Sequence, residues 1–132
     1  MDENTSDEQN EISDAEYRHI CRHNVKEDLA TLASPEAQLE YHRQAPVDIA
    51  TEMACTWFDH HYRLNEPAFV TAFSDEEWKA LADFSARFEN FTDDFDYQKH
   101  PEISGLLQRP DWKRVIKAAK IALAVFEENG SG

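Results

Sequence analysis

Apolar residues recur every three or four positions along most of this chain, which is the spacing of α-helices that pack on one side. The first such segment opens with a capping box, in which the Ser13 oxygen and the Glu16 carboxylate satisfy free amides at the helix start. A second, shorter helix is predicted over residues 34–44, because a serine N-cap is followed by proline at the first helical position. We expect the first helix to end at about Ala33 and to bury one stripe, made of Tyr17, Cys21, Val25, Leu29 and Leu32.

A third helix is predicted after Pro46 and ends at about Leu64. Its apolar residues cover more than half of the helical circumference, so we expect contacts from several sides and a place at the centre of the fold. No window shows sustained alternation of apolar and polar residues, and the only candidate strand is the short apolar run 68–73.

The clearest boundary lies at Ser74, where a serine N-cap is followed by acids in the first helical turn and by Glu77 at the capping-box position. The helix that begins here continues to about Asp96, unless Thr92 caps a new turn, so that residues 74–96 form either one helix or two. Its inner stripe is largely aromatic and contains Trp78, Leu81, Phe84 or Ser85, Phe88, Phe91 and Phe95.

In the last part of the chain, the pattern predicts one short helix or turn over residues 103–108, which we expect Gly105 to interrupt. A final helix is predicted from Pro110 to Glu128. The whole pattern indicates an all-α, single-domain bundle of five to six helices. With eight Phe, four Tyr and three Trp, its core should be rich in aromatic residues. We place the domain at residues 13–129 and expect a flexible tail over residues 130–132.

Composition makes the molecule strongly acidic, with 27 Asp and Glu against 13 Lys and Arg and a formal charge of −14. Residues 1–12 carry no base and almost no apolar residue, so we expect a disordered acidic leader. Such a charge repels nucleic acid and anionic membrane surfaces and favours a basic protein partner. Glycine-rich phosphate loops are also excluded, because Gly105 is the only glycine before residue 130. In the absence of a targeting or membrane-spanning pattern, we expect a cytoplasmic protein.

A second block of negative charge coincides with the helix that begins at Ser74. Residues 66–96 hold nine acids and only two bases, Lys79 and Arg87. Acids on a docking surface raise the association rate with a basic partner, and an aromatic anchor beside them supplies affinity. A solvated helix face is the alternative explanation. The predicted partner-binding residues are Asp75, Glu76, Asp83, Glu89, Asp93, Asp94, Asp96 and Tyr97.

Two histidine clusters are candidates for chemistry. His19 and His23 have the i, i+4 spacing that can chelate a metal ion, but a solvent-exposed helix face on which histidines lie beside carboxylates is the favoured explanation. The second cluster, Asp59, His60 and His61, has an imidazole beside a carboxylate, which is the arrangement of a general base. His61 is more typical, however, of a core histidine that forms a hydrogen bond with a backbone carbonyl or a tyrosine. We therefore predict no catalytic, metal or cofactor site.

The sequence favours a non-enzymatic, acidic protein-binding module that blocks a basic partner, as inhibitors and immunity proteins of bacterial toxins do. One alternative is an adaptor subunit, whose third and last helices would keep part of their wide apolar faces exposed until it assembles. The other is a helical metal-dependent enzyme or sensor built on one of the histidine clusters. The basic ridge Lys113, Lys117 and Lys120 is expected to complement the acidic segment of the same fold.

Overall fold

The computed structural model describes residues 13–45, 48–94 and 102–128, and in these ranges it contains helices and no strand. The all-α class is therefore confirmed. The leader expected over residues 1–12 and the tail over 130–132 lie outside the described residues. The helices are α2 (Asp14–Ala33), α3 (Pro35–Gln44), α4 (Ile49–Cys55), the π-helical segment η1 (Thr56–His61), α5 (Pro67–Val70), α6 (Asp75–Asp94), α7 (Ile103–Gln108) and α8 (Pro110–Glu128).

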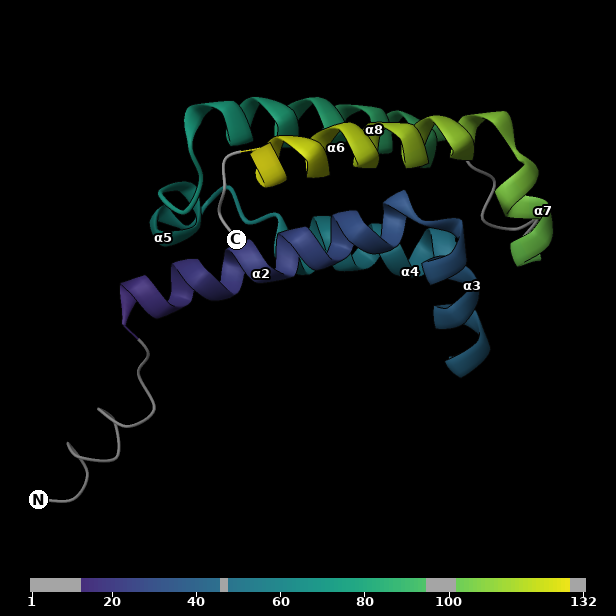
Figure 1. Cartoon of the computed structure of the whole chain (residues 1–132), viewed down its shortest axis with the longest axis horizontal. Coiled ribbons are helices and arrows are strands. Elements are labelled where there is room, and N and C mark those ends of the chain that lie inside the picture. Colours follow the sequence, from purple (N-terminus) through teal and green to yellow (C-terminus); the bar gives the residue numbers. More distant parts are fainter. Residues whose placement is uncertain (1–12, 46–47, 95–101, 129–132) are drawn as a thin grey trace, which may run out of the picture.

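The long helices form two layers, with α6 and α8 side by side in one layer and α2 with α4 in the other (Figure 1). The short helices close the ends of the bundle, α5 near one end and α3 with α7 at the other (Figure 1). Helix α8 packs along both α2 and α6, so the last helix has the central position that we expected of the third. Its buried arc is wide and includes three alanines, Ala118, Ala119 and Ala122, which let neighbouring helices approach closely.

The predicted helix starts are confirmed by their hydrogen bonds. The Ser13 hydroxyl oxygen accepts from the Glu16 backbone N–H at 3.1 Å, and Ser34 accepts from Ala37 at 3.0 Å. Helix α2 ends at Ala33, as expected. These caps satisfy amide groups that have no partner within their own helix, which is why they could be read from local sequence.

The third helix departs from its prediction. It begins at Ile49 and changes after Cys55 into the wider π-helical turn η1, in which the Tyr62 N–H donates to the Trp57 carbonyl at 2.8 Å. The wider turn accompanies one local and one long-range contact of Trp57. Its indole stacks on Tyr62, five residues later, with ring centroids 5.3 Å apart, and donates to the Ser85 hydroxyl of α6 at 3.1 Å. The segment therefore follows tertiary packing rather than its own helical period.

Three smaller expectations are also settled. The candidate strand 68–73 is wrong, because Pro67 at the first position opens the short helix α5 instead. Helix α6 is a single helix as far as Asp94, and Thr92 lies inside it with its hydroxyl donating to the Glu89 carbonyl at 2.8 Å. Gly105 lies within α7 and does not break it.

The core is aromatic, as expected, and every tryptophan indole in it has a hydrogen-bond acceptor. Trp57 and Trp112 are completely buried, and Trp112 donates to the Gln38 side-chain oxygen at 2.9 Å. Trp78 donates to the Val70 carbonyl at 2.7 Å. Burying large rings stabilises the domain by removing apolar area from water, and the paired N–H groups avoid the penalty of an unsatisfied buried donor.

Candidate functional site

The predicted acidic surface lies on the solvent side of α6. All of its described members are exposed, and among them only Asp83 forms an ion pair, with Arg87 one turn later at 3.1 Å. Two predicted members, Asp96 and Tyr97, lie outside the described residues. Glu77 is the exception among the acids of α6, because it is buried. The exposed set, named the α6 acidic face below, is Asp75, Glu76, Asp83, Glu89, Asp93 and Asp94.

Among the described residues, the phenylalanines of α6 do not supply the expected anchor. Phe84, Phe88 and Phe91 are each at most 4% exposed and point into the core, where Phe91 packs on Trp112 with ring centroids 5.0 Å apart. Because a helix presents residues seven apart on the same side, the aromatic stripe and the acidic stripe lie on opposite faces. Within the described residues, we therefore look for an apolar contact on a neighbouring element.

Helix α8 provides exposed apolar surface beside these acids. An open groove of about 630 Å³ lies between the two helices, with Ala80 and Ala82 on α6 and Ile121 and Val125 on α8, and it is bordered by charged residues of α6. Ile121 is 57% exposed. Ile121 was not singled out from the sequence. The available signal was its position, because this isoleucine lies outside the buried stripe of the last helix, which is rich in lysine. The charged residues along the border are Glu76, Lys79 and Asp83.

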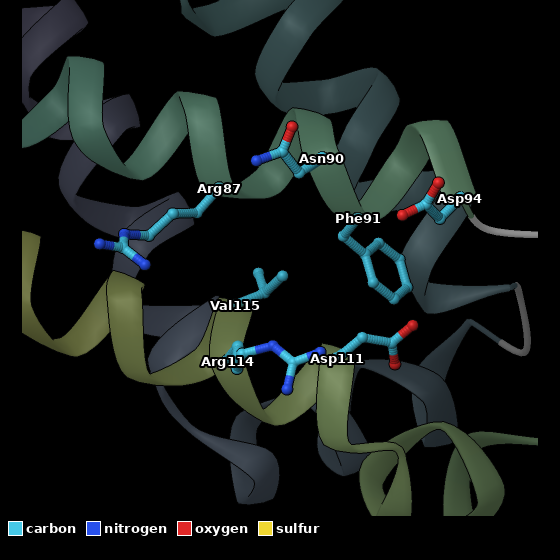
Figure 2. Close-up of a pocket in the computed structure, with 7 residues that line it drawn as sticks. All are labelled: Arg87, Asn90, Phe91, Asp94, Asp111, Arg114 and Val115. Atoms are coloured by element: carbon cyan, nitrogen blue, oxygen red, sulfur yellow. The ribbon is translucent and has the colours of Figure 1, made fainter.

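A smaller pocket of about 160 Å³ lies farther along the same two helices (Figure 2). Its charged residues are two arginines and two aspartates, so their charges cancel. Arg109 donates to Asp111 at 2.8 and 3.0 Å and, together with the Trp112 N–H, holds the pKa of that carboxyl below its usual value. The pocket is smaller than typical small-molecule sites, which occupy about 300–1,000 Å³. Its lining residues are Arg87, Asn90, Phe91, Asp94, Asp111, Arg114 and Val115.

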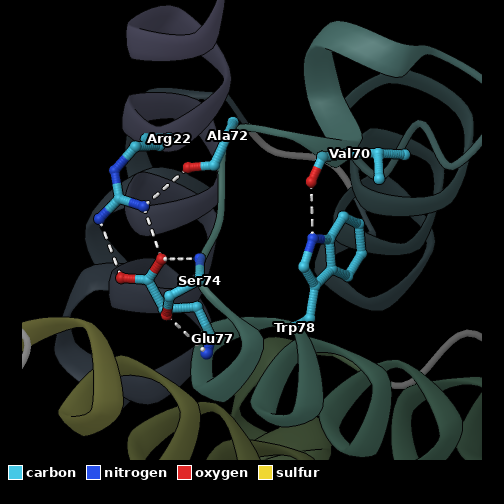
Figure 3. Close-up of polar contacts among 6 residues, drawn as sticks. All are labelled: Arg22, Val70, Ala72, Ser74, Glu77 and Trp78. Atoms are coloured by element: carbon cyan, nitrogen blue, oxygen red, sulfur yellow. Dashed lines mark hydrogen bonds and ion pairs between the residues drawn. The ribbon is translucent and has the colours of Figure 1, made fainter.

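A partly buried ionic network fixes the start of α6 and with it the position of the acidic face (Figure 3). The Arg22 guanidinium, from α2, donates to both carboxylate oxygens of Glu77 at 2.6 and 2.9 Å and to the Ala72 carbonyl at 2.9 Å. Glu77 also accepts from the Ser74 backbone N–H at 2.9 Å, while its own N–H donates to the Ser74 hydroxyl at 3.2 Å. The capping box predicted from sequence is therefore also a link between two helices.

The histidines within the described ranges do not assemble into a metal site. His19 and His23 are both exposed on α2, and the described residues contain no group of three or more His, Cys, Asp or Glu side chains arranged around a metal position. Asp59 and His60 are exposed and lie apart from the core.

His61 is half-buried, and its partner is an acid that the sequence did not indicate. Its Nδ1 lies 2.5 Å from the carboxylate of Asp28, on α2. Burial raises the pKa of Asp28 above its usual value, although the contact with His61 opposes this shift. The expected partners of a core histidine, a carbonyl or a tyrosine, are thus replaced by a carboxylate 33 residues away. The pair joins α2 to η1.

The basic ridge of α8 does not complement the α6 acidic face. Lys113, Lys117 and Lys120 line a groove on the side of α8 that faces α3 and α7, and no described acid forms an ion pair with any of them. The expectation of an internal charge complement is therefore wrong, because the rotation of α8 turns its lysines away from α6.

No helix in the described part of the chain combines the length and the apolar character that crossing a bilayer requires. Comparison with models of protein families, with curated proteins and with solved structures gave no match to this chain.

Proposed function

We propose that this chain is a non-enzymatic protein-binding module that neutralises a basic partner, as inhibitors and immunity proteins of bacterial toxins do. The observation that carries the proposal is the α6 acidic face together with the apolar groove that borders it. Six exposed acids project from one helix of 20 residues, which spans about 30 Å. That length suits a standard protein interface, which buries about 800 Å² on each partner.

The two parts of the surface have different physical roles. The acids attract a basic partner over distances comparable to the Debye length, about 10 Å at 0.1 M salt, and so raise the association rate. The groove beside them holds Ile121 and Val125, which are the apolar contacts that would slow dissociation. A partner is therefore expected to present Lys or Arg around an apolar side chain that enters the groove.

The partly buried Arg22–Glu77 network supports this proposal by making the surface rigid. A preorganised face loses less conformational freedom on binding than a mobile one, so more of the contact energy appears as affinity. The first turn of α6, which carries Asp75 and Glu76, is held by this network from α2.

The adaptor alternative receives less support. It required the third and last helices to keep wide apolar faces exposed, but Ile49, Ala50 and Met53 of α4 are buried, and so is most of the apolar arc of α8. The large exposed apolar residues lie scattered over α2, α3, α5, α8 and the turn after η1.

The proposal is tested with a short peptide that carries arginines on one helical face and leucines on the other. Its affinity is measured by fluorescence anisotropy at several salt concentrations. The paired variant Glu76→Gln with Asp83→Asn removes two charges beside the groove and should weaken binding by roughly threefold to tenfold, since each exposed ion pair contributes about 0.2–1 kcal/mol. Its salt dependence should also become shallower.

A matched control removes two charges elsewhere. Glu36 occupies the first turn of α3, as Glu76 does in α6, and Glu127 is an exposed acid near the end of α8. The variant Glu36→Gln with Glu127→Gln has the same net charge as the test variant and should bind the peptide as the natural chain does. Equal weakening in both variants would show that only net charge matters and would contradict a docking site on α6.

A further inference from the structure

A second groove, on the opposite side of α8, has the reverse charge. It lies where α3, α7 and α8 meet, has a volume of about 360 Å³, and has apolar walls from Pro35, Leu107 and Ile116. Three lysines line it, and they belong to one ridge of α8: Lys113, Lys117 and Lys120.

The three ammonium groups are available for a ligand. Their i, i+4, i+7 spacing spreads them over about 10 Å along the helix. All three are exposed, and none forms an ion pair within the described residues. In a chain of charge −14, such a concentration of unpaired positive charge beside an apolar surface is locally complementary to an anion that also carries an apolar group.

We propose that this groove binds a single molecule of an anionic amphiphile, such as a medium-chain carboxylate. The carboxylate contacts the lysine ridge, and the alkyl chain lies against Leu107 and Ile116. The volume is within the range of small-molecule sites, about 300–1,000 Å³. A protein partner is a poorer match, because this short junction offers far less than the 800 Å² or so that each side of a standard interface buries.

Lysine suits this role because its ammonium is a mobile point charge on an apolar stem. The stem extends the apolar wall while the charged end follows a head group in a groove open to water. The site depends on neither the α6 acidic face nor its proposed basic partner, so each proposal stands or fails without the other.

The test is a titration of the full chain with decanoate, kept below the concentration at which it forms micelles. Binding is followed through the methyl resonances of Leu107 and Ile116 in ¹H–¹³C NMR spectra. We expect saturable shifts of these methyl groups. Lys117→Gln removes the central charge and should weaken binding by roughly 1.5-fold to fivefold, the effect of one exposed ion pair. Lys79 is another exposed lysine, beside the other groove, and Lys79→Gln should leave the affinity for decanoate unchanged.

Two other probes separate the contributions of head and chain. Acetate has the charge without the chain, and decyltrimethylammonium has the chain with the opposite charge, so neither should reproduce the decanoate shifts. Similar shifts from acetate would reduce the site to an anion contact, and similar shifts from the cation would reduce it to an apolar contact. Either of these two results overturns the proposal. It is also overturned if both lysine variants weaken decanoate binding equally, or if the decanoate shifts centre on residues outside the groove.

Discussion

The link between Arg22 and Glu77 should be one of the strongest single determinants of stability in this domain. Glu77 is 2% exposed and accepts three hydrogen bonds, two from Arg22 and one from the Ser74 backbone N–H. Glu77→Ala removes the reciprocal half of a capping box, which costs about 1 kcal/mol. It also leaves the guanidinium without its carboxylate, and breaking a buried pair costs about 3–5 kcal/mol.

The second cost is reduced here because Arg22 keeps other contacts. Its side chain is 22% exposed, donates to the Ala72 carbonyl, and lies 5.7 and 5.4 Å from the ring centroids of Phe73 and Phe126. We therefore expect a total loss of about 3 kcal/mol, which corresponds to a decrease of roughly 10 °C in Tm for a domain of this size. Urea denaturation followed by circular dichroism measures the loss directly.

A double-mutant cycle separates the pair from its surroundings. Arg22→Met alone should also cost about 3 kcal/mol, because Glu77 stays buried and charged after it loses both hydrogen bonds from the guanidinium. The double variant should be less destabilised than the sum by about 2 kcal/mol, since no unpaired charge remains. Glu76→Ala, on the exposed neighbour, should cost less than about 1 kcal/mol. Additive effects of the two substitutions, within about 0.5 kcal/mol, would refute the reasoning.

Three further outcomes are expected. The hydrogen bond to Glu66, assisted by burial, raises the pKa of Tyr17 to about 12. Because the folded protein holds this proton more tightly than the unfolded chain, the protonated phenol stabilises the fold. The stabilisation is complete below the unfolded pKa of about 10 and is lost as pH rises through about 12. Ultraviolet titration should therefore show a phenol ionising near 12 that returns toward about 10 in Glu66→Gln, and an unchanged titration would contradict the assignment. A colorimetric thiol reagent should modify Cys55, which is exposed, much faster than Cys21, whose pKa is raised by burial; equal rates in the native protein would disagree with the fold. Gln38→Ala should lower the free energy of unfolding by about 2–4 kcal/mol in urea denaturation, because it opens a cavity and leaves the buried indole N–H of Trp112 unpaired. A loss below about 1 kcal/mol would show that the site relaxes.

The parts of the fold that could be predicted from sequence are those determined by neighbouring residues. Ser13 and Ser34 cap their helices through amides three positions away, and the apolar stripe of α2 follows from the helical period alone. For the same reason the exposed acids of α6 could be placed on one face before the structure was known, since their orientation depends only on the helix that carries them.

The features that sequence did not reveal depend on contacts between distant elements. The π-helical turn η1 brings Trp57 to Ser85, and Asp28 meets His61 across two helices; neither pair has a local signature. The groove beside the acidic face was missed because it is formed jointly by α6 and α8. Ile121 becomes a candidate contact residue only because the packing of the two helices places it beside the acids of α6. The position of the lysine ridge depends likewise on how α8 is rotated in the bundle.

The most direct test of the proposed function is to locate the bound basic peptide on the surface of the chain. Backbone amide shifts in ¹H–¹⁵N NMR spectra are recorded during a titration with the arginine and leucine peptide. The account predicts that the largest shifts cluster at the groove between α6 and α8, around Glu76, Asp83, Ile121 and Val125, and that they decrease in the Glu76→Gln, Asp83→Asn variant. Shifts centred on another surface, or undiminished in that variant, would contradict it.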